Sequence, residues 1–366
     1  MVDISVLVPV YRESQHLPAM LERLEAQKAS KELIVTVDEP TQSFIAETRK
    51  FRNVKFIFNT VRVGKATALN EAVKTSSGRI LLFLDADLAL PDDCDFLSKI
   101  IEEMAHTDVL DIKKRVERKN FLSKMTYYEY FTFNISAWLA SKHLRRCPAV
   151  NGAAFAIRRE AFLGVGGFRK VVAEDIDIAT RAFLKDYRFA YTKNVEVRNL
   201  VHSNWKSWFT QRKRWAMGQA LWLKDWHRDL LSKCASKPQV FLPGVFFLYP
   251  SMMALFLAAT VPSAWMYKSL WIFSFLLSVK FNIALPVFLV SMTMADLLKS
   301  LLISLGSFAA TAILFLLYSR KLGFEIKLHE LFIYYFFYST LWLTIIITAA
   351  IKTLVFKKTS IPDWKT

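Results

Sequence analysis

The chain has 366 residues, of which 53% are hydrophobic, and a formal net charge of +17. This composition is richer in apolar side chains than is usual for a soluble protein, and three widely separated cysteines exclude a zinc cluster or a disulfide framework. Residues 1–232 carry 37 basic and 28 acidic side chains, and an apolar tail follows them. Because the basic part is joined to that tail, we expect its positive charge to attract anionic lipid headgroups and phosphate-bearing substrates rather than nucleic acid.

The first part of the chain alternates strand-like and helix-like segments. Strands are predicted at residues 4–10, 33–37, 54–58 and 79–84, and helices at 17–27 and 66–74. This order is typical of an α/β fold with a doubly wound, mainly parallel sheet. Ligands of such sheets bind beyond the carboxyl ends of the strands, and Asp38 and Asp85 follow two of these ends.

Two amphipathic segments, 120–146 and 203–232, combine aromatic and basic side chains. Trp and Tyr favour the membrane–water interface, so we predict that both helices lie on the bilayer surface. The alternative is that the rings face the protein core, as aromatic stripes often do. The rings concerned are Tyr127, Tyr128, Tyr130, Phe131 and Trp138 in the first segment and Trp205, Trp208, Trp215, Trp222 and Trp226 in the second.

A run of basic residues begins just before the first of these segments. It comprises Lys113, Lys114, Arg115, Arg118, Lys119 and Lys124. Two interpretations are open for this run, attraction to anionic lipid headgroups and an ordinary solvated charged face.

Long apolar stretches dominate the sequence after residue 235. Four segments approach the ~20 residues that cross a bilayer as a helix, at about 241–262, 270–293, 299–318 and 331–351. We therefore predict a catalytic domain over residues 1–235 and a multi-pass transmembrane domain over residues 236–366. Four crossings keep the basic C-terminus on the cytoplasmic side with the catalytic domain. Three crossings are the alternative, because Arg320, Lys321 and Lys327 would otherwise lie on the outer side.

Asp85 and Asp87 are the candidate metal ligands. The Asp-x-Asp pattern occurs three times in the chain, so the pattern alone is weak evidence. Asp85 and Asp87 follow directly on a buried-type strand, which places two carboxylates at a fixed edge where they need a compensating cation. Such oxygen ligands suit Mg²⁺ or Mn²⁺, which can neutralise the charge on a departing nucleoside diphosphate. A solvated turn at the end of the strand is the alternative.

A second pair of carboxylates, Glu174 and Asp175, precedes a predicted helix. A carboxylate held near an acceptor can take the proton of its hydroxyl as a general base, and a helix cap is the competing interpretation.

Further along, Gln211, Arg214 and Trp215 have the spacing of one helical face. An Arg there can contact phosphate, and a Trp can stack on a sugar or on the acceptor.

In this order the motifs resemble those of glycosyltransferase family 2, in the branch of the cellulose synthases, hyaluronan synthases and ceramide glucosyltransferases, which carries a QxxRW motif. The similarity covers roughly residues 4–220. Its motifs are Val8-Pro9-Val10-Tyr11-Arg12-Glu13, Asp38, Gly64-Lys65, Leu84-Asp85-Ala86-Asp87, Asn151-Gly152, Arg158-Arg159-Glu160, Gly166-Gly167-Phe168, Glu174-Asp175 and Gln211-Arg212-Lys213-Arg214-Trp215.

The resemblance implies a GT-A fold and inversion at the anomeric carbon by a single in-line displacement. It implies a nucleotide-sugar donor site at Pro9, Tyr11, Glu13, Asp38, Lys65, Asp85 and Asp87, with the metal on Asp87. Asp175 would be the catalytic base. The diphosphate and acceptor would lie near Glu174, Gln211, Arg214 and Trp215.

We therefore expect a membrane-bound enzyme that transfers a sugar, first of all from a UDP-sugar, to a lipid or lipid-linked acceptor at the cytoplasmic face. A processive polysaccharide synthase and a non-catalytic nucleotide-sugar-binding membrane protein are the alternatives. The chain departs from the family pattern at Arg12, where Asn is common, and at Glu39, where a second Asp is common. It also begins its first strand at Ile4 without the preceding transmembrane helices of the polymer synthases, which favours single transfer.

Overall fold

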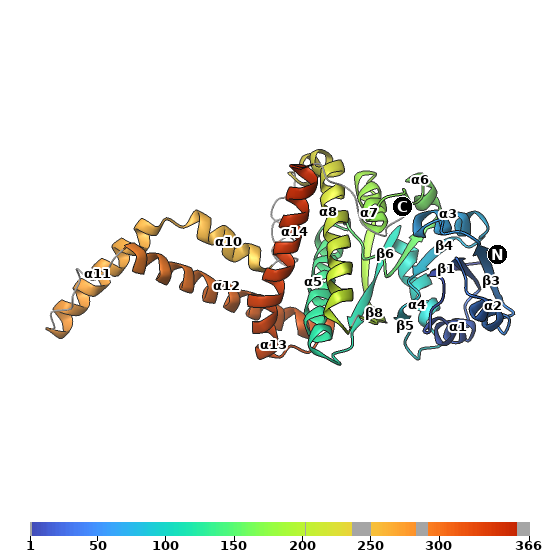
Figure 1. Ribbon diagram of the computed structural model, residues 1–366, viewed down its shortest axis with the longest axis horizontal. Coiled ribbons are helices and arrows are strands. Elements are labelled where there is room, and N and C mark those ends of the chain that lie inside the picture. Colours follow the sequence, from blue (N-terminus) through green and yellow to red (C-terminus); the bar gives the residue numbers. More distant parts are fainter. Residues whose placement is uncertain (1, 202, 236–249, 283–291, 357–366) are drawn as a thin grey trace. The chain divides into compact units, whose positions relative to one another are not determined.

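The computed structural model describes residues 2–201, 203–235, 250–282 and 292–356 (Figure 1). The chain divides into two compact units. The larger is Met1–Leu248 together with Thr344–Thr366, and the smaller is Tyr249–Leu343.

The larger unit is built on an eight-stranded sheet in the order β3-β2-β1-β4-β7-β6-β8-β5. Its strands are β1 Ile4–Tyr11, β2 Lys31–Asp38, β3 Val54–Asn59, β4 Ile80–Leu84, β5 Leu88–Ala89, β6 Val109–Val116, β7 Ala154–Arg158 and β8 Phe189–Asn199. The strands β3, β2, β1 and β4 are parallel, whereas β7 is antiparallel to β4 and β6, and β5 is antiparallel to β8. The predicted α/β fold is confirmed. The sheet is mixed rather than mainly parallel, because β7 enters it in the reverse direction beside β4.

Helices cover both faces of this sheet (Figure 1). They are α1 Leu17–Glu25, α2 Gln42–Thr48, α3 Lys65–Lys74, α4 Phe96–Glu103, α5 Phe121–His143, α6 Arg159–Gly164, α7 Glu174–Leu184 and α8 Trp205–Cys234, with a 3₁₀ turn, η1, at Met104–His106. On one face α1 and α4 share a core with the alternate residues Val8 and Leu82 of the strands. On the other face Phe83, Phe155 and Phe168 stack with the α6 side chain Phe162. Alternation along buried strands produces these two cores.

The parallel strands end at the same edge of the sheet. Tyr11 at the end of β1 is in register with Asp38 at the end of β2, which is in register with Asn59 at the end of β3. Loops from neighbouring strands therefore meet at this edge, as the predicted ligand position requires.

Four of the five rings named on α5 face the core, and the fifth, Trp138, is half-buried. Tyr127, Tyr128, Tyr130 and Phe131 are at most 5% exposed, and α5 packs on β6 and β8. The core alternative is thus the correct one for these rings, and they offer no surface to a bilayer. On α8, Trp205 is 45% exposed, and bilayer contact by this helix stays a prediction.

The basic run before α5 is largely paired within the protein. Lys114 is buried against Asp111 on β6, and the Lys113 ammonium lies 2.8 Å from the carboxylate of Glu196 on β8. Neither lipid headgroups nor bulk solvent reach these two lysines, so both interpretations are wrong for them. The sequence pattern did not show that this segment is a central strand.

The smaller unit and the end of the chain are helical. The helices are α10 Pro250–Thr260, α11 Ser263–Phe281, α12 Met292–Leu322, α13 Leu328–Ile333, the π-helical segment η3 Tyr334–Tyr338 and α14 Ser339–Leu354. In the described part of the chain, two helical stretches are long and apolar enough to cross a bilayer, Ala295–Leu322 and Leu328–Leu354. They contain the predicted segments 299–318 and 331–351. The predicted segments 241–262 and 270–293 lie partly outside the described residues, so the count of crossings stays a prediction.

The close packing at Gly78 yields a test of the fold. A Cβ atom there would lie 2.5 Å from Oγ of Ser5 and 2.6 Å from the Ser5 backbone nitrogen. We expect Gly78→Ala to lower the free energy of unfolding by about 1–3 kcal/mol, because backbone atoms cannot move aside cheaply. Thermal unfolding of the detergent-solubilised chain measures this. Gly306→Ala is the control, because nothing lies within 4 Å of its Cβ position, and an equal loss in both variants would contradict the prediction.

Candidate active site

Asp85 and Asp87 lie in the turn that follows β4. All five residues of β4 are buried, and Asp85 is the first residue beyond them. The Asp85 amide donates a hydrogen bond to the Ala153 carbonyl (2.8 Å), and the Leu200 amide donates to the Asp87 carbonyl (3.3 Å). The Ser14 hydroxyl donates to the Ala86 carbonyl between them (2.8 Å). Hydrogen bonds from three other segments thus fix this turn at the edge of the sheet.

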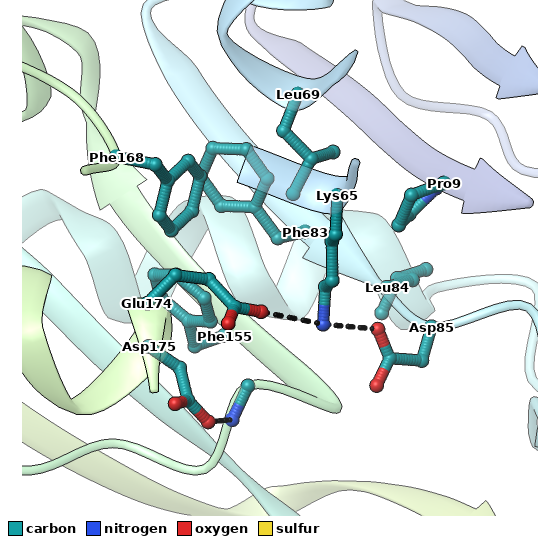
Figure 2. Close-up of a pocket in the computed structure, with 11 residues that line it drawn as sticks. Pro9, Lys65, Leu69, Phe83, Leu84, Asp85, Phe155, Phe168, Glu174 and Asp175 are labelled. Atoms are coloured by element: carbon teal, nitrogen blue, oxygen red, sulfur yellow. Dashed lines mark hydrogen bonds and ion pairs between the residues drawn. The ribbon is translucent and has the colours of Figure 1, made fainter. Parts of the chain in front are cut away.

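Lys65, the first residue of α3, joins two carboxylates. Its ammonium lies 2.7 Å from the Asp85 carboxylate and 3.3 Å from the Glu174 carboxylate. Burial favours the neutral amine, but the charges of Asp85, Glu174 and Asp175 outweigh it and hold the pKa of Lys65 above its ordinary value. Lys65 is therefore a fixed cation between the Asp-x-Asp turn and the Glu174-Asp175 pair (Figure 2).

Asp87 carries the second carboxylate of the turn. Desolvation by the surrounding protein, and then the charge of Asp85, raise the pKa of Asp87 to about 6. The positive charges of Lys65 and Arg214 oppose that rise. Two neighbouring carboxylates of this kind fit a hard divalent cation. No cluster of three or more His, Cys, Asp or Glu side chains is placed to hold a metal in the described ranges. A metal at Asp85 and Asp87 would thus complete its shell with water and diphosphate oxygens.

Glu174 and Asp175 form the first turn of α7. Glu174 is 7% exposed, and burial raises its pKa while Lys65 opposes the rise. The Asp175 carboxylate accepts hydrogen bonds from the Gly152 amide and from the Ile176 amide, both at 2.8 Å. The N-cap position of α7 is Ala173, the residue directly before Glu174. Asp175 is thus not the helix cap, and its carboxylate is oriented by Gly152 from a distant loop.

Lys65, Asp85, Glu174 and Asp175 line one pocket, whereas Asp87 is not among its lining residues (Figure 2). Apolar side chains complete the lining. The lining residues are Pro9, Lys65, Leu69, Phe83, Leu84, Asp85, Gly152, Phe155, Phe168, Glu174 and Asp175. Four predicted donor-site or acceptor-site side chains besides Asp175 are therefore brought together here, Pro9, Lys65, Asp85 and Glu174.

Asp38 organises the loop between β3 and α3. Its carboxylate accepts hydrogen bonds from the Asn59 side chain (2.9 Å) and from the amides of Val63 (3.1 Å) and Gly64 (2.9 Å). Asp38 is 5% exposed. The structure therefore gives it a structural role next to Lys65, and a direct nucleotide contact by Asp38 stays a prediction.

Tyr11 stands at the exposed end of β1, 45% exposed. Its hydroxyl donates to the Glu39 carboxylate (3.1 Å), and the guanidinium groups of Arg12 and Arg62 lie 5.3 and 4.5 Å from its ring centroid.

Glu13 accepts a hydrogen bond from Thr41 (2.9 Å) at the same edge. Arg12 and Glu39, the two departures from the family pattern, form an ion pair at 3.6 Å.

Gln211, Arg214 and Trp215 lie on α8, as predicted. The charge of Arg214 acts on Asp87, which ties this helix electrostatically to the Asp-x-Asp turn. Helix α8 also approaches the segment before Glu174 closely, because a Cβ at Gly218 would lie 3.2 Å from that of Ala173. Arg214 and Gly218 thus place this part of α8 near Asp87 and the segment before Glu174, and contacts of Gln211 and Trp215 with a substrate stay a prediction.

Sequence reasoning missed several charged residues of this region. Lys114 and Asp111 form a buried ion pair on β6, where burial lowers the pKa of Lys114 and raises that of Asp111. Arg212 is 0% exposed and pairs with Glu129 of α5. The only available signal was a charged residue inside an otherwise apolar helix or strand, which Glu129 in the aromatic run of α5 provides.

Comparison with protein families supplies the class of the domain. Residues 5–163 match the model described as glycosyl transferase family 2. Over these residues, somewhat less than half of the chain, the sequence has the pattern of a family 2 glycosyltransferase domain. The match begins in β1, includes the Asp85-Ala86-Asp87 turn and ends in α6. The family part of the resemblance is thereby confirmed.

Two curated relatives share a name. A poly-β-1,6-N-acetyl-D-glucosamine synthase of Staphylococcus epidermidis is 29% identical over 241 residues, 63% of this chain and 58% of that protein. One of Staphylococcus aureus (strain COL) is 27% identical over 241 residues, again 63% and 58%. The chain thus spans less than two thirds of the length of the curated relatives it matches.

A solved structure has the same fold. It is the mannosyltransferase PcManGT from Pyrobaculum calidifontis in complex with GDP-Man and Mn²⁺, with a TM-score of 0.51 and 21% identity, covering 81% of this chain and 86% of that one. The expected Rossmann-like GT-A fold is confirmed by this likeness and by the sheet described above.

Gly152 yields a test of how the Asp175 carboxylate is held. A Cβ at Gly152 would lie 2.6 Å from Oδ2 and 2.7 Å from Cβ of Asp175. We expect Gly152→Ala to turn this carboxylate away and to lower kcat for glycosyl transfer by about a hundredfold, as small misplacements of reacting groups do. Steady-state kinetics measures it, with nucleotide affinity by calorimetry as the control. Wild-type kcat in a folded Gly152→Ala variant would contradict this role of Gly152.

Proposed function

We propose that this chain is a membrane-bound, inverting glycosyltransferase that moves a sugar from a nucleotide-sugar to an acceptor hydroxyl at the membrane surface. The Lys65 bridge carries the proposal, because one ammonium lies 2.7 Å from Asp85 and 3.3 Å from Glu174. Asp175 follows Glu174 directly and lines the same pocket. A diphosphate site and a candidate base therefore face one space, as displacement at a carbon between them requires.

In the proposed reaction, Asp175 accepts the proton of the acceptor hydroxyl as its oxygen forms a bond to the anomeric carbon. The bond from that carbon to the diphosphate oxygen breaks in the same step, the configuration inverts, and the nucleoside diphosphate leaves with the electron pair. Lys65 and Arg214 supply positive charge where negative charge develops on the leaving group. The Gly152 amide keeps the Asp175 carboxylate oriented.

Asp87, with Asp85 beside it, would hold Mg²⁺ or Mn²⁺ through carboxylate oxygens. When bound, such an ion acts as a Lewis acid that neutralises the diphosphate charge. Pro9, Tyr11, Glu13 and Asp38 would form the nucleotide side of the donor site. We propose a UDP-sugar as donor, with UDP-N-acetylglucosamine as the first to test, because two relatives are named as synthases of an N-acetylglucosamine polymer.

We propose a lipid or lipid-linked acceptor, reached from the cytoplasmic face of the cell membrane. Two helical stretches with the length and composition of membrane spans support a multi-pass anchor. The exposed Trp205 at the start of α8 supports contact of this helix with membrane lipids. Gln211, Arg214, Trp215 and Glu174 would then form the acceptor and diphosphate side.

A processive polysaccharide synthase is the second candidate. The names of the relatives favour it, since both are polysaccharide synthases. If the lipid acceptor is correct, we expect one sugar to be added per acceptor, because each product leaves with its lipid. Mass spectrometry and gel analysis of the products decide between the two, since a ladder or a high polymer would replace single transfer by processive synthesis.

Asp175→Asn tests the reaction itself. The amide keeps the shape of the carboxylate and can still accept one of its two hydrogen bonds, from Gly152 or from Ile176, but it cannot take a proton. We expect turnover to fall by about a hundredfold to ten-thousandfold, the usual contribution of a general base. Purified protein is incubated with a panel of nucleotide-sugars, Mg²⁺ or Mn²⁺ and native lipids, and nucleotide release is measured.

Nucleotide binding by calorimetry is the control for this variant, and we expect it to be unchanged. No release by the wild type with any donor would overturn the proposed enzyme and leave the third candidate, a non-catalytic nucleotide-sugar-binding membrane protein. Full turnover by Asp175→Asn would overturn the role of Asp175 as the base.

A further inference from the structure

Arg212 lies inside the Gln211–Trp215 motif and is fully buried. Its Nη2 atom lies 2.5 Å from a carboxylate oxygen of Glu129 on α5, and the two side chains are 0% and 2% exposed. A buried charge requires a partner, so this ion pair fixes α8 to α5 at one point. Glu129 as a whole residue is 1% exposed, so its carboxylate has little access to water.

The same guanidinium contacts both ends of the motif. Its Nη1 atom donates a hydrogen bond to Oε1 of Gln211 (3.1 Å), and its carbon lies 4.3 Å from the ring centroid of Trp215. That distance is within the range of a cation–π contact. The Trp208 ring flanks the guanidinium as well, at 5.5 Å. A guanidinium held by Glu129 therefore determines where the Gln211 amide and the Trp215 ring point.

We propose that Glu129 and Arg212 are positioning residues, which orient Gln211 and Trp215 for their contacts with the acceptor and the diphosphate. The effect on transfer rests on the proposed function, whereas the orientation of the Trp215 ring does not. The planar guanidinium is needed for this role, because it pairs with a carboxylate, donates to an amide and stacks on a ring at once, which an ammonium cannot do.

The first test observes the Trp215 ring directly and needs no activity. The full chain, labelled with 5-fluorotryptophan in detergent, is examined by ¹⁹F NMR, and the Trp215 signal is identified by its loss in Trp215→Phe. We expect Glu129→Gln to shift or broaden this signal, because the neutral amide holds the guanidinium less firmly. The matched control is Glu32→Gln, since Glu32 accepts hydrogen bonds from Ser5 and Gly78 at the other end of the sheet. The Trp215 signal is expected to stay unchanged there.

The proposal is overturned if Glu129→Gln folds and its Trp215 signal is the same as in the wild type. Arg212→Lys is the second variant, which keeps the charge but loses the stacked plane. We expect it to shift the Trp215 signal as well, and it decides the question if Glu129→Gln does not fold.

The second test is a double-mutant cycle on transfer. We expect Glu129→Gln to lower kcat by about tenfold to a hundredfold, the cost of a small misplacement, and to leave the donor KM unchanged. In the Trp215→Phe background the same change should have a smaller effect, because the part that acts through the Trp215 ring is already lost and only the part through Gln211 remains. Equal losses in both backgrounds would show a purely structural role. If the wild type transfers no sugar, the proposed function fails, and the NMR result still decides the positioning of Trp215.

Discussion

The ammonium of Lys65 between two carboxylates is the interaction on which the arrangement of the site depends. Asp85 belongs to the turn after β4, Lys65 to the start of α3 and Glu174 to the start of α7, so three separate segments meet at one charge. Without it, carboxylates from two segments would face each other across a small pocket. The hydrogen bonds of Asp38 to the amides of Val63 and Gly64 hold the loop that delivers Lys65 to this position.

A second set of contacts ties α8 to α7, and hence the QxxRW-like residues to the candidate base. The indole of Trp222 donates to Thr180, and that of Trp226 donates to Asp177, both on α7. Asp177 also pairs with Arg169 and Arg181, so this buried carboxylate joins α7, α8 and the preceding loop. Tryptophans that resemble an interfacial belt in sequence thus serve in part to connect two helices of the larger unit.

The segment that matches the family model and the segment beyond it hold different parts of the candidate site. The family match over residues 5–163 contains the strands β1 to β7, the Asp-x-Asp turn and the pocket-lining residues from Pro9 to Phe155. The QxxRW-like residues and α7 lie beyond the end of that match, and they include the candidate base and the residues proposed for the acceptor side.

The sequence by itself determined six of the first seven elements within a few residues, missing the short helix α2, and it also gave the positions of Lys65, Asp85 and Asp175, because strand runs, amphipathic helices and short motifs are local patterns. It left the direction of β7, the burial of the α5 rings and the pairing of Lys114 with Asp111 open. Only the tertiary structure decided these, and it also joined Arg212 to Glu129, 83 positions apart. Such pairs follow from how distant segments pack together, and a pairing between distant positions leaves no periodic signal in a single sequence.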